Sequence, residues 1–347
     1  MFALLTLAAL AQEPSSEHFI LHGDAPPVGA VPEAGALIVQ ASAFGLTIKL
    51  FYCSASLIAP DVVLTAAHCI EPERMAREQY GVELDAAELY FTRQPDVSAF
   101  SLTSGERPEL PPDAAHAHLA IAHPDWVGAT NLIGPLGDNY DVAVLFLDRP
   151  RFDQPLAVLP TAAEAALLTQ GDPVELAGWG QQNADSGPTG QLRWAHTTVG
   201  EMSATELQTG PLATDPHICF GDSGGPTFWS SPLAAPGTGP RRQIGVTSHT
   251  WDDTGCANAG GVSTRVDFYL DWLDQTLRDG CANGTRSWCD PDPLQQGVIP
   301  PRVPEEAVGG CTSAPVGVGW WLVVVAAGMG RRRRGAIAVS AGGERGW

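Results

Sequence analysis

Three short segments of the 347-residue chain carry the residue types that nucleophilic catalysis needs. His68 follows Thr-Ala-Ala and precedes a cysteine, Asp141 opens an apolar run, and Ser223 lies within Gly-Asp-Ser-Gly-Gly-Pro. A serine hydroxyl is a weak nucleophile at neutral pH and needs a base within hydrogen-bonding distance. An imidazole can accept the hydroxyl proton, and a carboxylate can hold the second ring nitrogen in the required tautomer. The three segments therefore predict acyl transfer at Ser223.

Each of these residues has another interpretation. A histidine beside a cysteine can bind metal, but no Cys/His spacing of a metal site follows His68, so we expect none. Asp138 and Asp153 compete for the carboxylate role, yet only Asp141 directly precedes the apolar run, which leaves Asp138 as second choice. The glycines around Ser223 also fit the nucleophile elbow of an unrelated esterase fold, in which the histidine comes last. The upstream position of the histidine argues against that fold.

In this order the segments resemble the chymotrypsin/trypsin-like serine proteases, over about residues 20–281. Ala-Gly-Trp-Gly at residues 177–180 and Ile-Ala-His-Pro at residues 121–124 extend the resemblance. The resemblance implies hydrolysis of peptide bonds in protein or peptide substrates through an acyl-enzyme, without a cofactor. The alternative is a catalytically inactive homologue that serves as a binding module.

The resemblance also assigns roles. His68, Asp141 and Ser223 form the triad, and the backbone N–H groups of Gly221 and Ser223 bind the oxyanion. Of the seven cysteines, the family pattern pairs Cys53–Cys69 and Cys219–Cys256. Proximity alone suggests Cys281–Cys289, which leaves Cys311 unpaired, as a sorting or lipid-attachment role would require.

Ile-Leu-His-Gly at residues 20–23 resembles the N-terminus that this family exposes when a zymogen is cleaved. The implied mechanism is a buried ion pair between the Ile20 α-amine and the Asp222 carboxylate, which orders the oxyanion loop. Phe19 precedes the bond to be cut, so we expect an activating protease that accepts an aromatic residue, or another copy of this chain.

Primary specificity is predicted from the residues that line the family's S1 pocket. His217, six residues before the nucleophile, maps to the pocket floor, where trypsin-like members have an aspartate. Without that carboxylate we expect no preference for Arg or Lys. The order we expect is a small or medium apolar residue, then an acidic one, then an aromatic one. The opposite wall maps to Ser248, His249, Thr250 and Gly261.

Short β-type runs separated by turn residues predict an all-β fold. The resemblance implies two six-stranded antiparallel barrels, about residues 20–150 and 151–267. Apolar residues three and four apart predict a C-terminal helix over residues 268–279. Residues 75–136, which include His116 and His118, are predicted to form a surface insertion whose histidines are solvated rather than metal-bound. The β-type runs are 36–40, 46–52, 62–64, 142–147, 174–177, 244–247 and 262–266.

Both ends of the chain suggest export. Residues 1–11 form an apolar run ending in Ala-Leu-Ala, which predicts a signal peptide, although no Lys or Arg precedes it; a buried strand is the alternative. Residues 12–19 would then be a short propeptide. Residues 282–310 are predicted to hold the last disulfide loop and a Pro-rich linker.

The segment 311–334 carries Cys311, an apolar stretch with two tryptophans, and four arginines. It resembles the MYXO-CTERM type of bacterial surface-sorting signal, although a tail at 335–347 follows; an ordinary membrane anchor is the alternative. Either interpretation places the folded part at the bacterial membrane or cell surface, or releases it outside the cell, where disulfides persist.

Composition limits the partners. The formal net charge is −20, which repels phosphate backbones and predicts no nucleic-acid partner. Hydrophobic residues make up 44% of the chain, enough for a folded core, and the 38 glycines and 29 prolines suit a loop-rich β protein.

Overall fold

The computed structural model describes residues 20, 23–101, 108–129, 136–182, 190–234, 239–251, 256 and 260–289. All of them belong to one compact unit, Met1–Arg302. The predicted signal peptide, propeptide and sorting segment, with Cys311 and the tail, lie outside the described residues.

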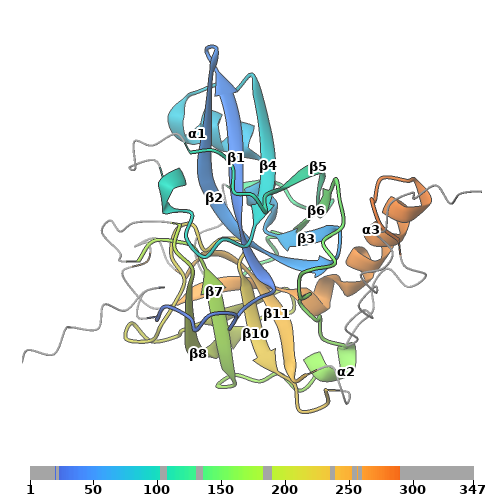
Figure 1. The fold of residues 1–347 in the computed structure, drawn as a ribbon. Helices are drawn as coiled ribbons and strands as arrows, with labels where there is room; N and C mark the ends of the chain where they lie inside the picture. The colour runs from blue at the N-terminus through green and yellow to red at the C-terminus, as the bar shows by residue number, and fades with distance from the viewer. Residues whose placement is uncertain are drawn as a thin grey trace, which may run out of the picture. The chain divides into compact units, whose positions relative to one another are not determined.

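The first half of the described chain forms a closed antiparallel barrel in the order β1-β2-β3-β6-β5-β4 (Figure 1). A long hairpin joins β1 to β2, and pairing of Leu37 with Phe91 between β1 and β4 closes the barrel. All five residues of β6 are buried, as expected for an apolar run in a barrel core. The strands are β1 (Ala34–Ala43), β2 (Leu46–Ala59), β3 (Val62–Thr65), β4 (Ala86–Thr92), β5 (Ala115–Ala122) and β6 (Ala143–Leu147).

The second half forms another closed antiparallel barrel, in the order β10-β11-β12-β9-β8-β7. Phe228 pairs with Glu175 where β10 meets β7 and closes the cylinder. The predicted fold of two six-stranded barrels is therefore confirmed. Its strands are β7 (Pro173–Gly178), β8 (Arg193–Met202), β9 (Glu206–Thr209), β10 (Pro226–Ser230), β11 (Arg241–Thr250) and β12 (Gly261–Arg265).

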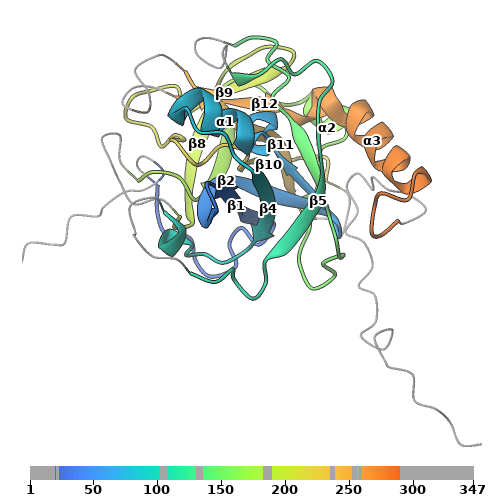
Figure 2. The same ribbon diagram turned by 90° about the horizontal axis from the view of Figure 1, so that it is seen from above.

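The predicted C-terminal helix is present as α3 (Leu270–Ala282), preceded by the short 3₁₀ turn η5 (Val266–Tyr269). Its fully buried Leu273 and Leu277 belong to the same apolar cluster as the first-barrel strands, and Figure 2 shows α3 along the outside of the barrels. None of the helices in the described part of the chain has the length and apolarity to cross a bilayer. The remaining helical segments are η1 (Ala67–Ile70), α1 (Pro72–Tyr80), η2 (Ser98–Phe100) and α2 (Ala162–Ala165).

The prediction of a surface insertion over residues 75–136 is wrong. This stretch contains β4 and β5, two of the six strands of the first barrel, and most of α1. The signal was weak because β5 carries polar residues among small ones, including His116 and His118. Both histidines are about one-third exposed, and both contact Asp148, at 2.7 and 3.2 Å from Nδ1 to the carboxylate.

A buried ion pair fastens the last described loop to the first barrel. Asp61 lies in the turn between β2 and β3, and Arg286 lies in the loop closed by the Cys281–Cys289 disulfide. Arg286 Nη2 donates to Asp61 Oδ1 at 2.5 Å, the Trp288 N–H donates to Oδ2 at 2.9 Å, and both charged side chains are fully buried. Residues 283–289 follow the last helix and belong to no strand or helix, and the Asp61 carboxylate holds them against the first barrel.

Asp61→Asn should destabilise the protein by about 3–5 kcal/mol, because the buried Arg286 guanidinium would lose its counter-charge. Thermal unfolding monitored by circular dichroism measures the effect. The matched control is Glu109→Gln, which breaks the exposed Lys49–Glu109 pair and should leave the melting temperature unchanged. Equal melting temperatures for Asp61→Asn and the wild type would contradict the prediction.

Candidate active site

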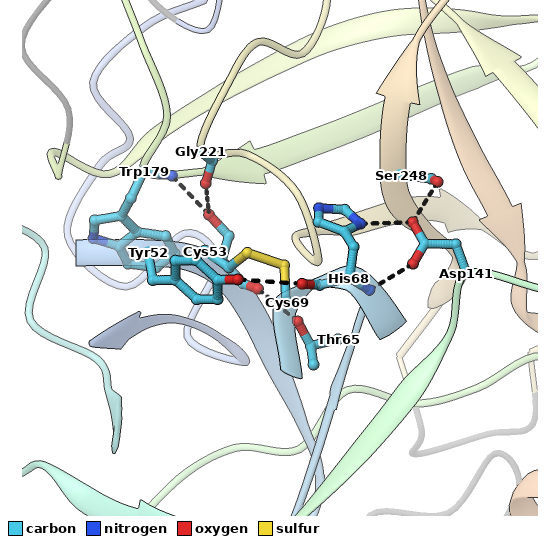
Figure 3. The surroundings of a disulfide bond; sticks show 10 residues. Tyr52, Cys53, Thr65, His68, Cys69, Asp141, Trp179, Gly221 and Ser248 are labelled. Atoms are coloured by element: carbon cyan, nitrogen blue, oxygen red, sulfur yellow. Dashed lines mark hydrogen bonds and ion pairs between the residues drawn. A yellow bond between two sulfur atoms is a disulfide. The ribbon is translucent and has the colours of Figure 1, made fainter. Parts of the chain in front are cut away.

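The pairing of β3 with β6 brings two of the predicted site residues together. Thr65 pairs with Ala143, so the residues just after β3 and just before β6 lie at the same end of the barrel. His68, in η1, directs Nδ1 at Asp141 Oδ2 over 2.8 Å, and its backbone N–H donates to Oδ1 at 2.9 Å (Figure 3). Two contacts to one carboxylate fix both the position and the ring orientation of the histidine.

The Asp141 carboxylate is completely buried and its oxygens all have donors. Ser248, on β11, donates its hydroxyl to Oδ2 at 2.6 Å, and Thr264 Oγ1 donates to the Asp141 carbonyl oxygen at 3.0 Å. Both donors come from the second barrel, so the carboxylate lies where the two barrels meet. Asp138, the second choice, instead accepts a hydrogen bond from Thr205 Oγ1 at 3.0 Å.

The electrostatics of the pair follow from this geometry. Burial raises the pKa of Asp141. The charge of His68 and the hydrogen bonds from His68 and Ser248 lower it by more than burial raises it, so the pKa of Asp141 ends below its ordinary value. Burial lowers the pKa of His68, while the Asp141 charge and hydrogen bond raise it more, so that it ends above its ordinary value. Asp141 is therefore ionised, Nδ1 carries a proton, and Nε2 is the nitrogen that can accept one.

Ser223 lies in the turn that precedes β10, within the oxyanion loop, which we define as residues 219–223. Gly221 has a φ of 95°, which favours glycine. The Phe220 carbonyl accepts the Gln181 N–H at 2.8 Å, and the Asp222 carboxylate accepts the N–H groups of Gly180 and Cys219, each at 2.8 Å. The loop is thus held at several points close to Ser223.

Burial raises the pKa of Asp222 to about 7, although the two backbone hydrogen bonds from Cys219 and Gly180 act in the opposite direction. The carboxylate is 1% exposed. Ile20 is equally buried, in a cluster with Leu176, Ala195 and Ile218. Ile20 itself has a φ of 42°, unusual for a β-branched residue.

A cavity of about 470 Å³ is lined by several of the predicted site residues. His68, Ser223 and Gly221 line it together with three residues of the predicted specificity wall, Ser248, His249 and Thr250. Among the described residues no hydrogen bond joins the Ser223 hydroxyl to His68. Catalytic hydrogen bonds are often long without substrate and shorten in the complex.

Two predicted specificity residues, His217 and Gly261, are not among the described residues that line this cavity. The His217 ring is buried, with Nδ1 2.8 Å from the Asp215 carbonyl oxygen and Nε2 3.0 Å from that of Cys256. The next residue, Ile218, lines the cavity instead. The sequence reasoning missed Ile218, Tyr52 and Met75, which also line the cavity.

Three disulfides join the pairs predicted from the sequence, Cys53–Cys69, Cys219–Cys256 and Cys281–Cys289. The first lies beside His68, and its sulfurs and the imidazole are close enough to suggest a metal site. Because the two sulfurs are bonded to each other, neither can act as a thiolate ligand.

Comparison with known proteins identifies the fold family. The family model described as Trypsin matches residues 23–273, most of the chain, and includes all the site residues described above except Ile20. The chain belongs to the trypsin family. Its domain is that of the chymotrypsin-like serine proteases, as the motifs suggested.

Among curated relatives in this family, tryptase of Mus musculus is 28% identical over 254 residues, covering 65% of this chain and 79% of the tryptase. The suppressor of tumorigenicity 14 protein homolog of Bos taurus is 30% identical over 238 residues, covering 64% of this chain and 24% of that protein. Melanization protease 1 of Drosophila melanogaster is 26% identical over 248 residues, covering 67% of this chain and 59% of that protein. The chain thus matches less than two thirds of the length of the last two relatives.

Proposed function

We propose that this trypsin-family protein is a serine endopeptidase that cleaves protein or peptide substrates through an acyl-enzyme. The observation that supports it most is the 2.8 Å contact between His68 Nδ1 and Asp141, at a cavity that Ser223 also lines. A buried carboxylate that orients an imidazole beside a serine is the arrangement that nucleophilic catalysis requires.

The residues divide the reaction as follows. Ser223 Oγ attacks the scissile carbonyl carbon while His68 Nε2 takes its proton, and the histidine then gives that proton to the leaving amine. Asp141 keeps Nδ1 protonated and stabilises the imidazolium. The backbone N–H groups of Gly221 and Ser223 bind the oxyanion, and each such donor contributes about 3–4 kcal/mol to lowering the barrier. Water then attacks the acyl-enzyme by the same route in reverse.

Covalent labelling tests this proposal. A fluorophosphonate should label the wild-type protein at one serine, and peptide mapping should place the label at Ser223. Activation should precede labelling in the same sample, so that an unprocessed chain is not mistaken for an inactive one. A correctly folded, processed protein that takes up no label would instead indicate the inactive homologue used as a binding module.

We propose further that the protein is a zymogen. Cleavage after Phe19 would free the Ile20 amine, and Asp222 offers a buried carboxylate that a cation would stabilise in its charged form. Asp222 lies within the oxyanion loop, next to Gly221, so an ion pair at its carboxylate would act directly on the backbone of Gly221. The activating enzyme would accept an aromatic residue, or would be another copy of this protein.

N-terminal sequencing of the active species should give Ile-Leu-His-Gly. Phe19→Arg offers a matched variant, because added trypsin should then activate the protein while the wild type stays unprocessed. An active species that still carries residues 12–19 would exclude this activation mechanism.

For specificity we propose a small or medium apolar residue before the cleaved bond. Ile218 lines the cavity, and both ring nitrogens of His217 face backbone carbonyls rather than the substrate space. Ser248, His249 and Thr250 form the opposite wall, and Gly261 lies behind Ile218. An acidic residue ranks second and an aromatic one third. A peptide-library profile that showed strong preference for Arg would contradict this assignment.

The acid limb of activity should lie above pH 6.5, the ordinary pKa of histidine. Only neutral His68 can accept the serine proton, and its pKa is raised by Asp141 despite burial, so kcat/KM should fall as pH drops through that raised value. A pH–rate profile measures it. His116→Gln, which removes a surface histidine paired with Asp148, is the control and should leave the limb in place.

Three disulfides in the described domain fit an oxidising compartment, which agrees with export. We propose that residues 1–11 direct export and that the 311–334 segment holds the protease at the cell surface or membrane. Expression of the full chain in a bacterium that carries MYXO-CTERM sorting machinery, followed by fractionation with and without residues 311–347, tests the second part. Equal release of both forms into the medium would refute a tether.

A further inference from the structure

We propose that Ser54 is a positioning residue that orients the oxyanion loop, a role that rests on the proposed function. Ser54 lies on β2, in the first barrel, and is completely buried. Its hydroxyl donates to the Gly221 carbonyl oxygen at 3.0 Å and accepts the Trp179 N–H at 3.0 Å. Figure 3 shows the Trp179 and Gly221 ends of these two hydrogen bonds, drawn as dashed lines.

The backbone of Ser54 makes a second connection to the site. Its N–H donates to the Ser223 carbonyl oxygen at 2.8 Å, and its carbonyl oxygen accepts the Thr65 hydroxyl at 3.0 Å. The preceding residue, Cys53, is bonded to Cys69, the neighbour of His68. One dipeptide of β2 therefore connects the segment that carries the base to the loop that carries the nucleophile and the oxyanion donors.

The hydroxyl contact holds the peptide that lies between the two oxyanion donors, the N–H groups of Gly221 and Ser223. The Gly221 N–H belongs to the peptide whose Phe220 carbonyl is held by the Gln181 N–H, and the Gly221 carbonyl belongs to the next peptide, held by Ser54. A trans peptide is planar, so holding the two carbonyls sets both planes that flank Gly221. Without a Cβ, Gly221 cannot resist rotation of these planes by itself.

Removal of the hydroxyl should therefore act on the transition state. In Ser54→Ala the half-buried Gly221 carbonyl oxygen and the buried Trp179 N–H lose this shared partner, and each then needs another hydrogen-bond partner. A rotation of the Gly221–Asp222 peptide toward such a partner changes ψ of Gly221 and φ of Asp222, which are torsions between the two oxyanion donors, so the Gly221 and Ser223 N–H groups would no longer converge on the oxyanion. Substrate binding in the ground state does not depend on that convergence, so acylation should change while binding does not.

The same strand offers a matched control. Ser56, two residues along β2, is also completely buried, and its hydroxyl donates to Gln243 Oε1 on β11 at 2.7 Å. Ser56→Ala removes the same chemical group from the same strand and also breaks a hydrogen bond between the barrels. It leaves the oxyanion loop untouched, because none of the hydrogen bonds of Ser56 in the described structure reaches that loop.

The experiment measures acylation by p-nitrophenyl acetate under pre-steady-state conditions, for variants activated identically. Competent sites are counted by fluorophosphonate labelling taken to completion, so rates refer to folded molecules only. For Ser54→Ala we expect the acylation rate constant per site to fall about 10–100-fold, somewhat less than complete loss of one oxyanion donor. The apparent dissociation constant of the ester should stay within about twofold, since ground-state binding is unaffected.

A tetrahedral adduct provides the second readout. The inhibition constant of phenylboronic acid should rise by about the factor by which acylation falls, because both depend on the oxyanion donors. Ser56→Ala should match the wild type in both measurements. Unchanged acylation in Ser54→Ala, or an equal loss in Ser56→Ala, would overturn the proposal for Ser54. A processed wild type that neither labels nor acylates would instead refute the proposed function itself.

Discussion

Ser223→Ala is expected to lower kcat by about 10⁶-fold, the effect of removing a serine nucleophile whose histidine and carboxylate partners remain. In the proposed mechanism the Ser223 hydroxyl forms the acyl-enzyme, and neither His68 nor Asp141 can take over that role. KM should change little, because the cavity walls at Ile218, Ser248 and Thr250 are unaltered. The measurement is hydrolysis of the best library peptide by processed protein, with wild type and variant side by side.

Two controls separate loss of the nucleophile from loss of structure. Ser230→Ala, at the exposed end of β10, removes a hydroxyl from the same region and should retain full activity. The melting temperature of Ser223→Ala should equal that of the wild type. Residual activity in Ser223→Ala at a tenth of the wild-type rate would show that another group attacks the substrate, and the proposed mechanism would fail.

The residues of the site differ in how far the sequence alone could locate them. His68 and Ser223 stand in short motifs in which neighbouring residues have fixed roles, and the structure places both at one cavity. Asp141 was distinguished from Asp138 only by the apolar strand that follows it. The structure supplies the physical reason: β6 pairs with β3, so the residue that opens β6 reaches the histidine that follows β3.

Other features could not be inferred because they depend on distant contacts. Ser54 and Gly221 are 167 residues apart, and a serine within an apolar strand carries no sequence signal for a loop of the other barrel. The predicted pocket floor at His217 followed from counting back from Ser223. Counting gives position along the chain, but the carbonyls of Asp215 and Cys256 determine where the ring points.

Strands β4 and β5 were missed for a local reason. β4 begins with Ala-Ala-Glu, and β5 has four alanines and two histidines with a single β-branched residue, Ile121. Such a pattern is weak evidence for a strand in isolation. Closure of the barrel requires these strands nevertheless, because β1 and β6 would otherwise leave unpaired edges.

Asp141→Asn should lower kcat by about 10⁴-fold, which is the typical effect of replacing the aspartate of a Ser-His-Asp triad by asparagine. The geometry here gives the reason. Oδ1 accepts the His68 backbone N–H, so the asparagine oxygen should keep that place and turn its NH₂ group toward Nδ1. Nδ1 would then accept a hydrogen bond and the ring proton would move to Nε2, which could no longer take the proton of Ser223.

Asp138→Asn is the matched control, because it tests the other carboxylate that the sequence offered. Asp138 accepts a hydrogen bond from Thr205, and an asparagine oxygen can accept the same bond, so activity should stay within about twofold. ¹H NMR of the imidazole protons would follow the tautomer in both variants. A 10⁴-fold loss in Asp138→Asn with an active Asp141→Asn would reverse the assignment, and with it the account of how His68 becomes a base.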